Sequence, residues 1–104
     1  MLDKKYSKDK IMTVGILQLI IFIPESNSLK RKRMVLHSIK ARLRNNFNVA
    51  VSQIDGEDKW QKAMLAVVGV EKTRQCVDSN LQGVINYVKG LHGVNLLDYE
   101  MEFL

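Results

Sequence analysis

The sequence has one cysteine, one proline and no apolar run long enough to cross a membrane. Cys76 has no second cysteine with which to form an internal disulfide, and a lone thiol suits a reducing cytoplasm. The mostly apolar stretch 11–23 is shorter than the roughly 20 residues of a spanning helix, and the polar residues before it do not resemble a signal peptide. We therefore expect a cytoplasmic protein without a membrane partner.

Acidic residues are absent from 26–54, whereas 30–44 contains seven cations. The formal net charge of the whole chain is +5, so the residues outside 30–44 carry a net charge of −2. The basic character is therefore confined to one segment. A local positive field attracts nucleic acid, anionic lipid or an acidic protein without choosing among them.

The length of 104 residues and the hydrophobic fraction of 46% are typical of one globular domain with one core. Residues 1–11 are mostly polar and show no periodicity, which predicts a flexible N-terminal tail. The single domain is then expected to span 12–104.

The basic segment 26–47 is predicted to be an amphipathic helix with Ser28 as its N-cap. Its cations crowd the first turn, where the helix dipole disfavours each by about 0.3–1 kcal/mol, so we expect them to serve something other than helix stability. We expect Lys32, close to the apolar side, to pack its stem and extend its ammonium into solvent. The predicted buried stripe is Leu29, Leu36, Ile39, Leu43 and Phe47.

The other segments complete an alternating pattern of strands and helices. Stretches 12–23 and 62–70 are apolar on both faces, as in central strands, whereas 48–55 and 94–104 each have a polar face. Thr73 is predicted to cap a second helix that Gly90 and Gly93 close, and the outer face of this helix is nearly neutral. Its predicted buried stripe is Val77, Leu81, Val84, Val88 and Leu91.

The order β-α-β-β-α-β predicts an α+β, ferredoxin-like sandwich, with a four-stranded antiparallel sheet in the order 4-1-3-2 and two helices on one face. The other face would then expose apolar side chains of the first and third strands. An apolar patch of this kind calls for a partner, most simply a second copy. We therefore expect a homodimer through the open sheet face.

Several short motifs occur in a characteristic order: Ile23-Pro24, SLKRKR at 28–33, FNV at 47–49, DKWQKA at 58–63 and LLD at 96–98. Together they resemble the YlxP-like family of small bacterial proteins of unknown function, over about residues 12–104. The resemblance implies a ferredoxin-like fold, a cytoplasmic bacterial protein and a gene often placed near those of transcription and translation factors. It implies no established activity.

The cations of the first helix are the candidate binding site. At helical spacing, Arg33, Lys40 and Arg44 form one stripe with His37 within a sector of about 60°. Like charges in such a stripe repel, which favours an anion between them. The residues expected to bind nucleic acid or another anion are Ser28, Lys30, Arg31, Lys32, Arg33, Lys40 and Arg44.

Two simpler explanations of these cations remain open. They can form a solvated face that favours solubility, or they can pair with the carboxylates of a neighbouring copy, namely Asp98, Glu100 and Glu102.

No catalytic residue, metal site or cofactor is predicted. The spacing of His37, Cys76 and His92 matches no ligand motif. The acidic turn with Asp55, Glu57 and Asp58 is more typical of solubility than of a divalent-cation site.

The central strands have too few aromatic residues to predict that the sheet binds RNA. Phe22 is the only aromatic residue of the central strands, whereas RNA-recognition sheets stack bases on aromatic rings. Trp60 is more typical of a core or interface anchor than of a base-stacking platform. Any nucleic acid is therefore expected on the helix side.

Two functions remain open. The first is a non-catalytic RNA- or ribosome-associated protein whose helix cations contact phosphates with little base specificity. The alternative is a homo-oligomeric regulatory module whose basic helix binds an acidic protein or a small anionic ligand.

Overall fold

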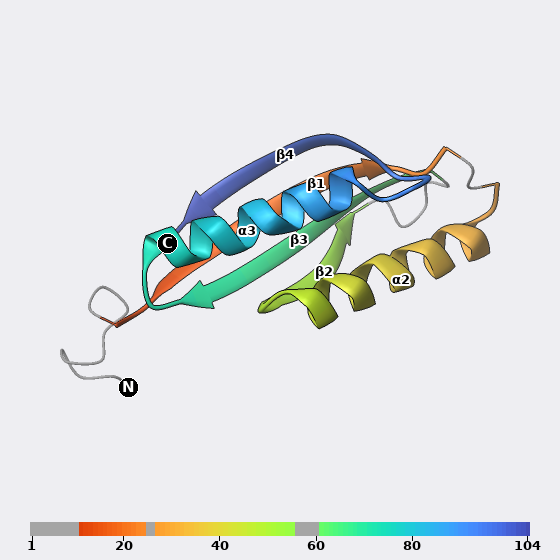
Figure 1. The fold of residues 1–104 in the computed structure, drawn as a ribbon. Helices are drawn as coiled ribbons and strands as arrows, with labels where there is room; N and C mark the ends of the chain where they lie inside the picture. Colours follow the sequence, from red (N-terminus) through yellow and green to blue (C-terminus); the bar gives the residue numbers. More distant parts are fainter. Residues whose placement is uncertain (1–10, 25–26, 56–60) are drawn as a thin grey trace.

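The structure is a computed structural model that describes residues 11–24, 27–55 and 61–104. Its elements follow the predicted order: β1 (Thr13–Phe22), α2 (Leu29–Asn46), β2 (Val49–Asp55), β3 (Lys62–Glu71), α3 (Arg74–Lys89) and β4 (Asn95–Phe103). The strands form one antiparallel sheet in the order β2-β3-β1-β4, and both helices cover the same face (Figure 1). This is the predicted α+β, ferredoxin-like fold. Apart from Ile11, the predicted tail lies outside the described residues.

β1 and β3 occupy the centre of the sheet, as their two apolar faces predict. They pair in an unbroken antiparallel register from Thr13 opposite Glu71 to Phe22 opposite Lys62. The side chains that point to the helices are fully buried and form the middle of the core: Leu17, Leu19, Ile21, Ala63, Leu65 and Val67.

The two helices cover different parts of the sheet. α3 packs on β1, β3 and β4, whereas α2 packs on the edge strand β2. The approach of α3 to β1 is close at Gly15, where a Cβ atom would overlap the side chain of Val77 and lie 2.8 Å from Cδ1 of Leu81. A side chain at position 15 would therefore push α3 away from the sheet.

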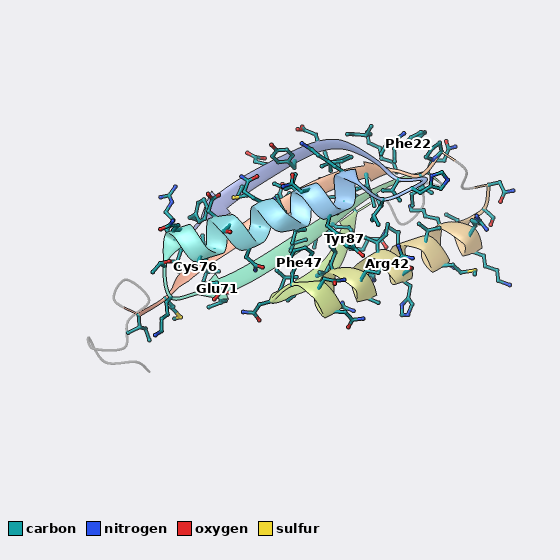
Figure 2. The ribbon with its side chains drawn as sticks, in the orientation of Figure 1. Phe22, Arg42, Phe47, Glu71, Cys76 and Tyr87 are labelled. Carbon is teal, nitrogen blue, oxygen red and sulfur yellow. The ribbon has the colours of Figure 1, made fainter. Side chains whose placement is uncertain are left out.

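α2 has the predicted amphipathic character, with Leu36, Ile39 and Leu43 buried on the sheet. Phe47 follows its last turn and meets the ring of Tyr87 edge-on at a centroid distance of 5.8 Å, so that it links α2 to α3 (Figure 2). Lys32 differs from the prediction. Its side chain is only 1% exposed, so the ammonium does not extend into solvent past the end of the helix.

β4 has the predicted polar face, on which Asp98, Glu100 and Glu102 lie opposite Ile20, Gln18 and Ile16 of β1. Strict strand alternation along 94–104 predicts Leu97 on the apolar face with Tyr99, Met101 and Phe103, and this prediction is wrong. A register shift between Ile20 and Ile21 places Leu96 opposite the buried Ile21, so Leu96 packs against the core and Leu97 is 52% exposed.

The sheet face away from the helices is called the open sheet face below. No helix of the described part covers it (Figure 1). Neighbouring strands shield the central side chains of this face only in part. These side chains are Ile16, Ile20, Phe22, Met64 and Val68. Val70 and Ile54 are 45% and 57% exposed. The carboxylates of β4 border this apolar surface along one edge.

Candidate functional site

The basic helix begins at a well-formed cap. Ser28 has an extended backbone, and its hydroxyl oxygen accepts a 3.1 Å hydrogen bond from the backbone N–H of Arg31. The first turn contains no acidic residue. Lys30, Arg31 and Arg33 therefore lie at the positive end of the helix dipole without a carboxylate in that turn to offset it.

Five of the seven cations of α2 lie on two flanks of its buried stripe. On the first, called the β2 flank, Arg33 and Gln53 of β2 line one small cavity, and Arg44 hydrogen-bonds to β2. Helical spacing places Lys40 on this flank as well. On the second, called the α3 flank, Arg31 and Arg42 face the connection between α3 and β4. Arg31 and Arg42, which were not part of the predicted stripe, thus lie on the opposite flank of the helix from it.

Three of the predicted binding residues have structural roles. The hydroxyl of Ser28 caps the helix, and Lys32 is enclosed by its surroundings. Nη2 of Arg44 donates a 2.7 Å hydrogen bond to the carbonyl oxygen of Val51. Lys32 is 1% exposed and lines the same cavity as Arg33, so it does not lie on the outer surface of the helix with the other cations.

The remaining cations of α2 are accessible. Lys30, Arg31, Arg33 and Arg42 are exposed, and Lys40 is partly exposed. Within the part of the chain that the structure describes, none of these five side chains makes an ion pair, a ring contact or a hydrogen bond. Nothing described in the fold uses their charge.

The cations of α3 provide an internal comparison. The guanidinium carbon of Arg74 lies 4.3 Å from the ring centroid of Phe103, and Nζ of Lys89 lies 5.6 Å from that of Tyr99. Both rings belong to β4, so these cation–π contacts hold α3 against the sheet. The charges at both ends of α3 thus support the fold, in contrast to those of α2.

A groove of about 310 Å³ runs between α2 and the α3–β4 connection. Its lining residues are Arg31, Met34, Val35, Ser38, Ile39 and Arg42 of α2, with Leu91, His92 and Val94. Figure 2 labels Arg42 on the side of α2 that faces α3. The sequence motifs and charge pattern did not assign Arg42, Met34 or His92 to a site. Helical spacing places Arg31 and Arg42 on the same side of α2, but only the tertiary structure places His92 opposite them.

The residues considered for catalysis do not come together. Cys76 is exposed in the first turn of α3, and His92 follows the last turn, which separates them by about 20 Å of helix. The described residues contain no group of three His, Cys, Asp or Glu side chains that could hold a metal ion. Glu57, Asp58 and Trp60 lie outside the described residues. No helix in the described ranges has the length and apolarity needed to span a membrane.

A family model described as "Protein of unknown function (DUF503)" matches residues 14–101. This chain belongs to the DUF503 family. A curated relative, "Uncharacterized protein YlxP" of Bacillus subtilis (strain 168), is 33% identical over 75 residues, which are 72% of this chain and 82% of that protein. The resemblance seen in the sequence motifs is thereby confirmed, and DUF503 is a family without a known function.

Two solved structures are similar to this chain over most of its length. A C-terminal segment of the alpha subunit of aIF2 from Pyrococcus abyssi matches with a TM-score of 0.49 and 14% identity, over 88% of this chain and 49% of that one. This chain thus spans about half the length of that segment. A mutant of SnoaB, a cofactor-independent oxygenase from Streptomyces nogalater, matches with a TM-score of 0.45 and 10% identity, over 89% of this chain and 90% of that one.

Proposed function

We propose that this DUF503 protein is a non-catalytic cytoplasmic protein that binds RNA, free or in ribosomal particles, through the exposed cations of α2. The observation that supports the proposal is the set of accessible cations without described partners: Lys30, Arg31, Arg33, Lys40 and Arg42. Phosphate groups would supply the negative charge that 26–54 lacks.

The electrostatic cost of the basic first turn supports the binding of a polyanion. Each exposed cation at the positive end of a helix dipole lowers helix stability by about 0.3–1 kcal/mol. A bound phosphate offsets this cost, and each phosphate contact releases condensed counterions. Contacts of this kind position a protein on a nucleic acid without reading its bases.

The open sheet face does not suit RNA, because Asp98, Glu100 and Glu102 border it and would repel phosphates. Its apolar centre favours a different partner. We propose that a second copy covers this face, since a homodimer would bury Ile20, Phe22 and their neighbours. A homo-oligomeric regulatory module that binds an acidic protein or a small anionic ligand is therefore the second candidate function.

Salt dependence of binding to a single-stranded RNA tests the first candidate. Four or five phosphate contacts predict that the logarithm of affinity falls against the logarithm of salt with a slope of about −3 to −3.5. The double variant Arg33→Gln, Lys40→Gln should bind the RNA more weakly, and the slope of its salt dependence should be less steep by about 1.4. Arg44 is left intact because it has a structural role.

The matched control removes two charges elsewhere. Lys62 and Lys72 are exposed at opposite ends of β3, so Lys62→Gln, Lys72→Gln lowers the net charge equally without altering α2. This control should retain nearly the wild-type slope. Equal losses in the two double variants would mean that net charge, rather than α2, attracts the RNA. Tight binding of an acidic protein without RNA binding would favour the second candidate.

A further inference from the structure

The groove on the α3 flank is built by the end of α3. The helix ends at Gly90, and Gly93 adopts a φ of 76°, a left-handed conformation that glycine enters without strain. The intervening connection places Leu91 and His92 beside α2. Val94 follows and is 7% exposed, so the connection is anchored in the core.

The floor of the groove is apolar and its ends are basic. Val35, Ile39, Leu91 and Val94 form the floor. Arg31 and Arg42 lie eleven residues apart on α2, which is about 16 Å along the helix axis. None of the described lining residues is acidic, so two guanidinium groups border an apolar floor without a neutralising carboxylate in the lining.

We propose that this groove holds an unpaired base of single-stranded RNA, with backbone phosphates of the same strand bound by Arg31 and Arg42 at its two ends. The inference rests on the proposed RNA-binding function and deepens it by naming the form of RNA and the place of the base. A groove of about 310 Å³ is at the lower end of the volumes of small-molecule sites, which suits a nucleotide better than a folded protein partner.

The lining supplies each interaction that an unpaired nucleotide needs. The apolar floor can contact the face of a base, and guanidinium planes stack on bases as well as binding phosphates. Met34 is 61% exposed at the groove, and its flexible thioether can adapt to bases of different size. The hydroxyl of Ser38 can donate to or accept from a base edge.

Duplex RNA cannot use the groove in this way, because its bases are stacked and paired. The β2 flank lies on the other side of the buried stripe of α2, where Arg33 and Lys40 can contact the phosphates of either form of RNA. The protein should therefore bind single strands more tightly than duplexes, and this preference should depend on the groove.

The test compares the full-length protein and its variants by fluorescence anisotropy on a single-stranded RNA of mixed sequence and on the same strand in a duplex. Ser38→Leu narrows the groove without changing any charge or adding an aromatic ring on which a base could stack, and circular dichroism checks that the variant is folded. It should weaken single-strand binding about tenfold and leave duplex binding unchanged. Arg31→Gln, Arg42→Gln should lose most of the single-strand preference. The matched control, Arg33→Gln, Lys40→Gln, should weaken both complexes to a similar degree.

Wild-type protein that binds both RNAs equally, with the predicted salt slope, would overturn the groove assignment and leave the proposed RNA binding intact. Undiminished single-strand binding by folded Ser38→Leu would also overturn the groove assignment alone. Absence of binding to either RNA would overturn both proposals. Binding of an acidic amphipathic peptide that Ser38→Leu abolishes, without RNA binding, would assign the groove to a protein partner instead.

Discussion

The guanidinium of Arg44 donates a hydrogen bond of 2.7 Å to the carbonyl oxygen of Val51, which joins the last turn of α2 to the edge strand β2. Val51 is 5% exposed, so this contact lies at the border of the core. Arg44 belongs by spacing to the basic stripe of α2, but its charge supports the packing of the helix on the sheet. The cations of this helix are therefore not interchangeable.

Replacement of Arg44 should destabilise the fold. Arg44→Gln removes the bond to Val51, and a hydrogen bond of this type contributes about 1 kcal/mol. Arg33→Gln is the matched control, because it removes an exposed charge from the unfavourable end of the helix dipole and should be neutral or slightly stabilising. Urea denaturation monitored by circular dichroism measures both. Equal stability of the two variants would show that the Arg44 contact contributes nothing.

Gly15 should resist substitution by alanine. The added Cβ would overlap Val77 and approach Cδ1 of Leu81, so α3 must shift, at a cost of about 1–3 kcal/mol. Gly90→Ala is the control, since the nearest atoms to its Cβ are backbone oxygens at 3.6 Å and its φ is −87°. Thermal unfolding should separate the two variants by several degrees. A Gly15→Ala variant as stable as Gly90→Ala would contradict this packing.

Lys32 should contribute to stability through its buried stem. Lys32→Ala removes methylene groups from a side chain that is 1% exposed, and we expect a loss of about 1–3 kcal/mol. Lys30→Ala is a nearby control, because Lys30 is exposed and the substitution favours the helix. Chemical denaturation provides the comparison. Similar denaturant concentrations at the midpoints of unfolding of both variants would show that Lys32 does not support the core.

The open sheet face should form a homodimer in solution. Ile20 and Val68 both lie on this face, since their strand neighbours Ile21 and Val67 point to the helices and are buried. Ile20→Lys or Val68→Lys should convert the dimer to a monomer in sedimentation equilibrium at tens of micromolar. Gln82→Lys, on the exposed face of α3, should leave the assembly unchanged. A wild-type monomer at this concentration would rule out the proposed interface.

The amino-acid sequence by itself determined the order of the elements and the positions of their ends. Ser28 and Thr73 were identified as caps because a side-chain oxygen at the start of a helix binds the N–H groups of its own first turn. β1 and β3 are apolar on both faces, whereas β2 and β4 each have a polar face, and this difference predicted that β1 and β3 lie at the centre of the sheet. These features depend on residues close together in the chain.

The tertiary structure alone decided how distant segments use their side chains. The bond from Arg44 to Val51, the burial of Lys32 and the register shift beside Leu97 each depend on a neighbouring segment, so helical or strand periodicity could not reveal them. The same holds for the groove, which exists because the connection after α3 lies against α2. A charge pattern identifies a basic helix, but the packing of its neighbours determines which cations hold the fold and which remain accessible to a ligand.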